Sequence, residues 1–345
     1  MIVGICGFGY TGSGAVLDFL REFDEVSVNE NIEMTFTYDP DGLLDLENAI
    51  YKNPIRFFSA DAGLKKFREY MLSFELRRYM KRVMTVKEYR LLIKKYTDSI
   101  IADFWYGFWH FDRRHSISSF WCYIKYIIGG KYLRIYDKLK LNLPKSFPNN
   151  TVMYIPVNSE CFYENTKRFV SEMMIAMGIS KDKPIKVLDQ PFPTNAPHKV
   201  FQFFDDKCKA IIVKKDPRDM YIFAKEFGRS LATFIPTDNV KIFVDYYRYQ
   251  MQICELDENT MILNFEDLVY QYGETEKKIC DFLGLGNHTK KRKFFDPSIS
   301  IGNTQVFKKF LKYENDIKYI EKELCEYLYP FEQFGEVAIT AETFV

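Results

Sequence analysis

The stretch Ile2-Val-Gly-Ile-Cys-Gly-Phe-Gly-Tyr-Thr-Gly-Ser-Gly-Ala-Val-Leu-Asp-Phe-Leu20 decides the fold of this 345-residue chain. Residues 2–6 are a nearly continuous apolar run, which is typical of a buried strand. Four glycines follow, and from residue 15 onward apolar side chains repeat at helical spacing. In a strand–turn–helix unit of this kind, free backbone N–H groups and the positive end of the helix dipole point at one spot. The stretch therefore predicts an anion-binding turn and indicates a phosphorylated ligand.

An ATP- or GTP-binding P-loop is the first interpretation of this turn. Gly7 and Gly12 have the required separation, but Ser13-Gly14 stands where such a loop has Lys-Ser or Lys-Thr. Since the missing lysine is the group that reaches the β- and γ-phosphates, nucleotide hydrolysis is not expected.

A dinucleotide-binding fold is the second interpretation. Gly7-x-Gly9-x-x-Gly12 satisfies the glycine pattern of that fold, and Glu30 lies near the position of its ribose-binding acidic residue. The N-terminal stretch alone leaves this alternative open.

Composition restricts the class of protein. Apolar residues make up 47% of the chain, which allows a substantial core, and the net charge of +1 gives no overall field that favours nucleic acid. The seven cysteines lie singly, which indicates neither a zinc site nor a disulfide framework. No basic leader precedes the first strand, and no apolar run reaches about 18 residues. We therefore expect a cytoplasmic protein without a metal ion, a nucleic-acid partner or a transmembrane segment.

The chain as a whole predicts a single α/β domain over residues 1–345, with a P-loop-like parallel sheet flanked by helices. Further strands are expected within 24–33, 185–190, 210–213 and 261–264. Residues from approximately 60 to 148 have amphipathic helical patterns and predict a helical insertion within this framework.

Two features of the insertion bear on function. Eleven basic residues and only three acidic ones lie between positions 65 and 95. They indicate either a solvated helix face or a surface that meets an anionic acceptor or a membrane headgroup layer. Residues 101–115 and 120–123 are rich in aromatic side chains, which predicts either packing between helices or the lining of an apolar or sugar acceptor site.

A second strand–loop–helix unit follows the apolar run at 210–213. Lys214, Lys215 and Arg218 come directly after this strand. Asp216 can cap the next helix and Pro217 can occupy its first turn. Capping does not explain three cations at this place, so we infer a second anion site.

Together these pieces resemble the bacterial-type sulfotransferases that use 3′-phosphoadenosine 5′-phosphosulfate (PAPS). Gly9-Tyr-Thr-Gly-Ser-Gly14 resembles their 5′-phosphosulfate loop, and Lys215-Asp-Pro-Arg-Asp219 is similar to the element whose first cation contacts the 3′-phosphate. Asn264–Val269, Phe282–Leu285 and residues 302–309 resemble the late strand–helix signature and the loop that closes over the nucleotide. The resemblance covers roughly residues 1–50 and 185–335, and it implies PAPS as cofactor. It also implies cofactor binding by Gly9, Tyr10, Thr11, Gly12, Ser13, Gly14, Lys215 and Arg218.

The chain departs from the family pattern at three positions. Tyr10 stands where the family usually has a lysine or arginine that stabilises the departing bridging oxygen. Phe223 replaces a serine that often binds the 3′-phosphate, and Phe307 replaces a tryptophan. The catalytic cation is therefore expected from elsewhere, with Lys308, Lys214 and Arg218 as candidates.

Sulfuryl transfer requires neutralisation of the leaving phosphate oxygens and removal of a proton from the acceptor. Some members of the family use a glutamate soon after the first helix as the base, and Glu33 is our preferred candidate by that resemblance. Asp189 is the second candidate because it ends a strand whose carboxyl end faces the ligand crevice in open α/β sheets. His198 is the third. Each also has an ordinary structural interpretation, as a surface carboxylate, a capping group or a structural histidine.

The sequence thus predicts a sulfotransferase that moves a sulfuryl group from PAPS to a hydroxyl or amine of a small-molecule, lipid or glycan acceptor, with no metal ion. Peripheral membrane contact is compatible with the basic helices. An NAD(P)-binding oxidoreductase and a catalytically degenerate nucleotide-binding module are the alternatives. Neither the acceptor nor the oligomeric state can be inferred from the residues.

Overall fold

The computed structural model describes residues 1–52, 54, 58–107, 151–228, 234–252, 255–286 and 288–334, together with scattered residues between 124 and 140. The chain divides into two compact units, Met1–Thr37 with Met173–Val345, and Tyr38–Glu172. The first unit contains both predicted anion sites. The second unit contains the predicted insertion at 60–148, and it begins earlier and ends later than that prediction.

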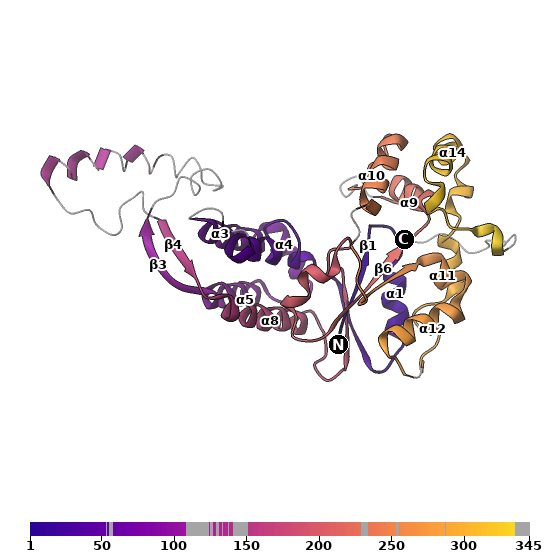
Figure 1. Cartoon of the computed structure of the whole chain (residues 1–345), viewed down its shortest axis with the longest axis horizontal. Helices are drawn as coiled ribbons and strands as arrows, with labels where there is room; N and C mark the ends of the chain where they lie inside the picture. Colours follow the sequence, from indigo (N-terminus) through magenta and orange to yellow (C-terminus); the bar gives the residue numbers. More distant parts are fainter. Residues whose placement is uncertain are drawn as a thin grey trace. The chain divides into compact units, whose positions relative to one another are not determined.

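The first unit is built on a five-stranded sheet with the order β2-β5-β1-β6-β7 (Figure 1). All four pairs of neighbouring strands are parallel. The predicted strand positions and the α/β class are therefore confirmed. The bounds of the strands are β1 Ile2–Gly7, β2 Val26–Glu33, β5 Ile185–Asp189, β6 Cys208–Lys214 and β7 Thr260–Asn264.

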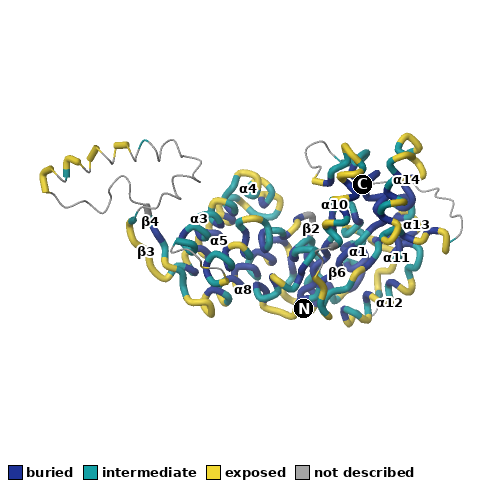
Figure 2. The backbone as a smooth tube through the Cα atoms, turned by 45° about the horizontal axis from the view of Figure 1, so that its top comes forward, coloured by how far each residue is buried: buried dark blue, intermediate teal, exposed yellow. Residues whose placement is uncertain are grey.

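Helices α1 (Ser13–Leu20), α11 (Phe265–Tyr270) and α12 (Tyr272–Leu283) cover one face of this sheet. Phe19 and Leu20 of α1 are fully buried in one cluster with alternate residues of the strands, because successive strand side chains point to opposite faces. Figure 2 shows the strands as mostly buried and α12 as exposed on its outer side.

The opposite face of the sheet is packed against residues 191–204. A Cβ atom added to Gly4 in the central strand β1 would lie 2.3 Å from the Phe192 ring and 2.7 Å from Pro191. The sheet and this segment therefore approach each other as closely as a glycine allows.

The remaining elements of the first unit follow the strands along the chain. They are η1 Thr35–Thr37, η3 Pro197–Phe203, α9 Pro217–Ile222, η4 Phe223–Phe227, α10 Val240–Gln252, α13 Pro297–Ser300, η5 Ile301–Asn303, η6 Val306–Lys309, η7 Leu311–Tyr313, α14 Glu314–Glu323, η8 Cys325–Tyr327 and η9 Phe331–Phe334.

The second unit is mainly helical, as predicted for the insertion, and also contains an antiparallel pair of strands. Its core is formed by apolar and aromatic side chains that include Phe67, Tyr96, Phe162 and Phe169. Its elements are α2 Leu43–Glu47, η2 Asn48–Lys52, α3 Ser59–Met71, α4 Phe74–Met80, α5 Val86–Ser99, β3 Ile101–Gly107, β4 Thr151–Pro156 and α8 Ser159–Ala176.

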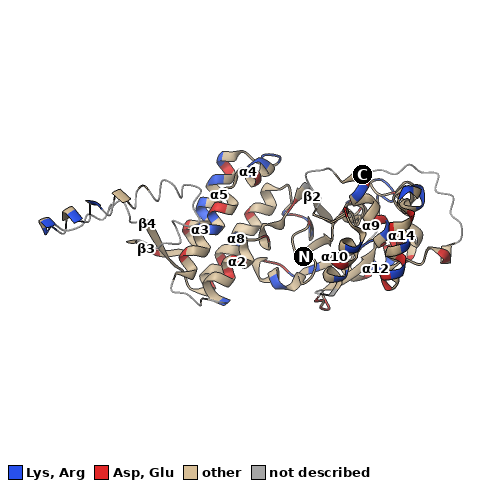
Figure 3. Cartoon of the chain, turned by 90° about the horizontal axis from the view of Figure 1, so that it is seen from above, with Lys and Arg blue, Asp and Glu red and all other residues tan. Residues whose placement is uncertain are grey.

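The two features of the insertion singled out in the sequence have different outcomes. The basic run is borne by α3, α4 and α5, and Figure 3 shows its lysines and arginines on these helices. The start of the aromatic stretch forms the strand β3. Its side chains Phe104, Trp105 and Tyr106 are exposed, so they do not pack helices together. Residues 108–115 and 120–123 lie outside the described residues. No helix in the described ranges is long and apolar enough to cross a bilayer.

The close approach at Gly4 generates a stability prediction. We expect Gly4→Ala to lower the free energy of unfolding by about 1–3 kcal/mol, since the new methyl group overlaps the Phe192 ring. Gly273→Ala in α12 is the control, because its added Cβ meets no atom within 4 Å and alanine favours the helix. Urea unfolding of both variants checks this, and equal stability of the two would contradict the packing described.

Candidate active site

The turn between β1 and α1 has the backbone conformation of an anion cradle. Gly9, Tyr10 and Gly12 have φ values of 86°, 53° and 82°, in the left-handed region that glycine adopts readily. Left-handed residues interspersed in a tight turn aim successive N–H groups inward. At Gly12 a side chain is excluded by space as well, because an added Cβ would lie 2.6 Å from the Phe265 ring.

The donors of this turn are available to a ligand. Gly12 is the N-cap of α1, and no side chain caps the helix or places an acidic group in its first turn. The Oγ1 atom of Thr11 is buried and has no hydrogen-bond partner within the described part of the chain. A buried hydroxyl group without a partner indicates that something absent from the free protein bonds to it. An anion at the N-terminus of α1 would satisfy both features.

Lys215 provides the second cationic group. It follows β6 directly, only 5% of its surface is exposed, and it forms no ion pair with any described residue. Instead its Nζ atom lies 3.8 Å from the ring centroid of Phe223 and 4.7 Å from that of Phe265. Two such cation–π contacts hold an ammonium group in place while leaving its N–H donors unused.

Three carboxyl groups near Lys215 affect the pKa of its amine. Burial lowers the pKa of Lys215, while Asp219, Glu266 and Asp216 act in the opposite direction. Burial raises the pKa of Glu266 to about 8 and that of Asp219 to about 7. At neutral pH the acid form of Glu266 is therefore favoured, so this group does not neutralise the cation.

Asp219 also fixes the segment that follows η5. Its Oδ2 accepts a hydrogen bond from the Gln305 backbone N–H at 2.7 Å, and its Oδ1 accepts one from that of Phe307 at 3.1 Å. Gln305 has a left-handed φ of 51°. The predicted closing segment is thus tied to α9, the helix that begins two residues after Lys215.

Arg218 has a different environment from the one predicted for a cofactor-binding residue. Its Nε and Nη2 atoms bond both oxygens of Asp216 at 2.9 and 2.7 Å, and its Nη1 bonds Glu321 at 3.0 Å. Its guanidinium group also stacks over Phe307 at 4.2 Å. Arg218 therefore fastens α9 to α14, and its donors are occupied within the chain.

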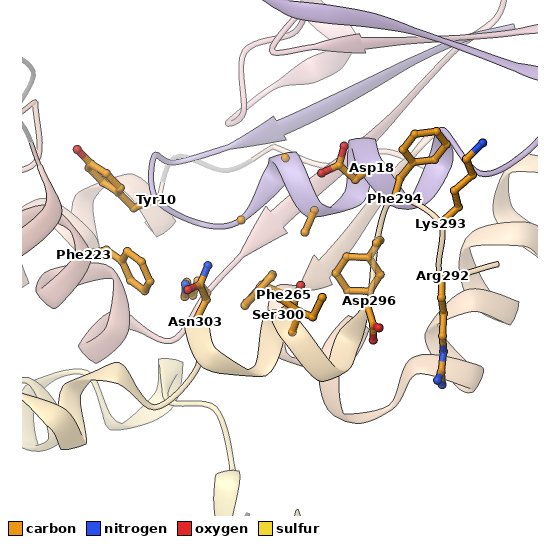
Figure 4. A pocket seen from close by; sticks show the side chains of 16 residues that line it. Tyr10, Asp18, Phe223, Phe265, Arg292, Lys293, Phe294, Asp296, Ser300 and Asn303 are labelled. Carbon is orange, nitrogen blue, oxygen red and sulfur yellow. The ribbon is translucent and has the colours of Figure 1, made fainter. Parts of the chain in front are cut away.

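A cavity of about 500 Å³ connects the turn with Lys215. Figure 4 shows Tyr10 and Phe223 at one end and Arg292, Lys293 and Phe294 at the other. Of the predicted cofactor-binding residues, Tyr10, Gly12, Gly14 and Lys215 line it, whereas Gly9, Thr11, Ser13 and Arg218 do not. The rest of the lining is Ala15, Asp18, Phe223, Phe265, the loop 292–296, Ile299, Ser300 and Asn303.

Asp189 and Glu33 form a carboxylate pair at the carboxyl end of the sheet. They are partners in the register of β5 and β2, and Asp189 is also the register partner of Ile5, two residues before Gly7. The Oδ1 atom of Asp189 is buried and has no hydrogen-bond partner among the described residues, whereas Glu33 is exposed. Burial, and then the charge of Glu33, raise the pKa of Asp189 to about 7.

Neither this carboxylate pair nor any of the other candidates is among the residues that line the cavity. Lys308 is exposed and donates a hydrogen bond to the side chain of Gln305. Lys214 ends β6 in register with Asn264, and His198 lies in η3 with its Nε2 3.9 Å from Glu255. A search of the described residues for three or more His, Cys, Asp or Glu side chains that could hold a metal ion found no group.

Sequence reasoning missed three parts of this site. Phe223 stood out only as a departure, yet with Phe265 it encloses the amine of Lys215. The loop 292–296 was not predicted as part of the site, and Asp18 carried no signal beyond its place in the first helix. A helical projection of α1 would have placed Asp18 one turn after Gly14, on the same side.

The turn geometry generates the second prediction. Gly12→Ala places a methyl group against Phe265 and forces alanine into a left-handed conformation, so we expect a loss of about 1–3 kcal/mol of stability. Gly14→Ala is the matched control, because its added Cβ lies in open space inside α1. Thermal unfolding of both variants checks this; a Gly12→Ala protein as stable as Gly14→Ala would contradict the turn geometry.

The raised pKa of Asp189 generates the third prediction, which concerns the dependence of stability on pH. A folded-state pKa of about 7, above the ordinary 3.8, means that stability is lost as pH rises through 7, where the buried group must ionise. We expect the melting temperature of Asp189→Asn, relative to that of the original protein, to rise between about pH 5 and pH 8. A difference that stays constant over this range would show that Asp189 is not buried as described.

Comparison with known proteins gives a fold-level likeness. No protein-family model and no curated protein matches the sequence. Among solved structures, the chain is similar to the sulfotransferase domain from the Synechococcus PCC 7002 olefin synthase, with a TM-score of 0.38 and 10% sequence identity over 88% of this chain and 86% of that chain. At this level of similarity the match assigns no residue a role.

Proposed function

We propose that this chain is a PAPS-dependent sulfotransferase. The observation that supports this most is that two separate anion-binding features, the glycine-rich turn and the amine of Lys215, face one cavity. PAPS carries a phosphosulfate and a separate 3′-phosphate on one nucleoside, so it needs two such features. A cavity of about 500 Å³ also falls in the range that holds ligands of this size.

The strand order argues against the dinucleotide alternative. In a dinucleotide fold the second strand lies beside the first, which brings its terminal acidic residue to the ribose. Here β5 lies between β1 and β2, so the ends of those strands are about 10 Å apart, two strand spacings. The side chain of Glu30 lies outside the described residues, and the end of its strand is in the wrong place for that role.

In the proposed complex each anion site has its own group. The backbone N–H groups of residues 9–14 and the hydroxyl group of Thr11 would hold the phosphosulfate, since no side chain caps the start of α1 and Thr11 Oγ1 has no hydrogen-bond partner in the described part of the chain. Lys215 would contact the 3′-phosphate with the N–H donors that its two phenyl neighbours leave free. Arg218 would support Lys215 through the position of α9 and not by contact.

Asp189 is the general base in this proposal. A base with a pKa near the working pH is the most effective, and Asp189 has a pKa of about 7. As the acceptor oxygen or nitrogen forms its bond to sulfur, the bond from sulfur to the bridging oxygen breaks and the acceptor proton passes to the carboxylate. Glu33, the residue preferred from the sequence, would act by raising the pKa of Asp189.

A nucleotide-binding module without transferase activity is the second candidate. Tyr10 occupies the place of the family's catalytic cation, and neither Lys308 nor Lys214 lines the cavity. Transfer of radiolabelled sulfate from PAPS to a panel of hydroxyl and amine acceptors separates the two. Binding of the nucleotide without transfer to any acceptor would favour the module.

The role of Lys215 generates the fourth prediction. We expect Lys215→Met to weaken the binding of adenosine 3′,5′-bisphosphate by about 1.5–3 kcal/mol, because a charge-assisted hydrogen bond is lost. Lys209→Met is the matched control, since Lys209 lies in β6, the strand that Lys215 follows, and over a phenyl ring, 4.6 Å from the centroid of Phe282, without lining the cavity. Calorimetry measures both; equal affinities would remove Lys215 from the site.

The role proposed for Asp189 generates the fifth prediction, which concerns the rate of sulfuryl transfer. The rate of transfer should rise with pH through about 7 as Asp189 ionises, and Asp189→Asn should abolish it without weakening nucleotide binding. Glu33→Gln should move the rise to lower pH, because a like charge next to Asp189 is removed. An active Asp189→Asn enzyme, or a Glu33→Gln profile unchanged in pH, would contradict this assignment.

A further inference from the structure

The far end of the cavity is formed by a loop whose backbone is hydrogen-bonded to one buried carboxylate, while Phe295 packs into the core beside it. Residues 292–296 of this loop all line the cavity. Glu22, just after α1, is fully buried beneath it. The Oε1 atom of Glu22 accepts hydrogen bonds from the backbone N–H groups of Phe294 at 2.8 Å and Phe295 at 3.0 Å, and its Oε2 accepts one from that of Arg292 at 3.0 Å.

His288 completes this attachment. Its Nε2 lies 2.6 Å from Oε2 of Glu22, and its Nδ1 lies 2.8 Å from Oε1 of Glu276 in α12. Its ring stacks on that of Phe23 at 4.4 Å and meets Phe19 edge-on at 5.4 Å. The imidazole ring is thus held between two carboxylates and two phenyl rings.

This arrangement requires a proton on both ring nitrogens. A neutral imidazole carries one N–H, so one of its nitrogens would present a lone pair to a carboxylate oxygen. Glu22 cannot supply the missing proton without giving up an acceptor site, because backbone N–H groups already donate to both of its oxygens. The pKa of Glu276 lies below its usual value, against a burial effect, through its hydrogen bonds to Lys291 and His288. The imidazolium form therefore matches the geometry.

The other charged groups around His288 do not replace that proton. Lys291 in the same loop bonds Oε2 of Glu276 at 2.8 Å, and Lys290 and Thr289 bond Asp24 at 2.6 and 2.9 Å. Tyr272 of α12 has a raised pKa from burial and the charges of Glu276 and Glu22. Arg292 lies over the ring of Tyr272, 5.8 Å from its centroid. These cations are paired elsewhere, and within the described ranges the partner of Nε2 of His288 is Glu22.

Arg292 makes the loop sensitive to this attachment. It has a left-handed φ of 61°, which is unfavourable for a residue with a side chain. The hydrogen bond from its N–H group to Glu22 holds it in that conformation. A weakened contact between Glu22 and His288 would allow the loop to relax and move the far wall of the cavity.

We propose that Glu22 and His288 are positioning residues of the nucleotide cavity, and that the proton shared in their contact couples ligand affinity to pH. Protonated His288 holds the loop 292–296 against the ligand. Without this proton, a lone pair of His288 faces a carboxylate. The loop 292–296 is then held less firmly, and the affinity for the ligand falls. The identity of the ligand rests on the proposed function, whereas the attachment of the loop does not.

Variants of His288 test the proposal. His288→Arg keeps a cation that cannot lose its proton and that stacks well on Phe23. His288→Gln keeps hydrogen-bonding capacity without charge. We expect adenosine 3′,5′-bisphosphate to bind His288→Gln on the order of tenfold more weakly than the original protein at about pH 6.5, as for other supporting contacts behind a binding site.

The pH dependence separates positioning from a general loss of structure. As the pH is raised, the affinity of the original protein should fall relative to that of His288→Arg and approach that of His288→Gln. The ratio to His288→Arg cancels the titration of the ligand's own phosphates and of Asp189. A ratio that is constant with pH would overturn the proposal.

A ligand-free measurement keeps this test apart from the proposed function. The protection factors for hydrogen exchange at the Arg292, Phe294 and Phe295 amides should fall with rising pH in the original protein and stay constant in His288→Arg. If the bisphosphate binds no variant at any pH, the proposed function fails while the exchange data still decide the role of His288. Protection that is the same in both proteins at every pH would overturn it.

Discussion

A buried ammonium group without a carboxylate bonded to it is the constraint around which the first unit is arranged. Moving such a cation out of water is costly unless it is paired, and among the described residues Lys215 contacts two aromatic faces and has carboxyl groups at longer range. An ion pair with Asp216 would stabilise Lys215, but Asp216 is already paired with Arg218. Lys215 is therefore left with donors that an anionic ligand can use.

The order of the strands brings the other parts of the site to this cation. Because all five strands are parallel, their carboxyl ends lie at one edge, and this edge carries the glycine turn after β1, Asp189 after β5 and Lys215 after β6. The placement of β5 beside β1 gives Asp189 a neighbour in the turn and separates β2 from β1. One topological choice thus supports a mononucleotide site with an adjacent base and disfavours a dinucleotide site.

Much of this could be predicted from the sequence because it depends on local patterns. The apolar runs fix the five strands, and the four glycines with their neighbouring polar residues fix the turn. The side of the sheet on which each strand lies could not be predicted, since pairing is set by contacts far apart in the chain. The carboxylate pair of Glu33 and Asp189 is a consequence of that pairing, so the sequence named both residues but not their relation.

Four residues show the limit of local reasoning in the site itself. Lys215 and Arg218 are both cations that follow a strand, so the sequence pattern does not distinguish them. The packing of α14 against α9 gives Arg218 an acidic partner, Glu321, whereas Lys215 has no ion pair with a described residue. From the sequence, Phe223 stood where a serine that binds the 3′-phosphate was expected. In the structure its ring contacts the amine of Lys215. Glu22 lies in a helix end that carries no motif, yet it fixes a loop more than 260 positions away in the chain.

The most direct test of the central claim is a comparison of ligands by thermal stabilisation. A ligand that binds only the folded state raises the melting temperature according to its excess over the dissociation constant. Adenosine 3′,5′-bisphosphate, NADH and ATP would be measured in parallel at equal concentration. The account predicts a shift with the bisphosphate that exceeds those with NADH and ATP. A shift with NADH and none with the bisphosphate would contradict it.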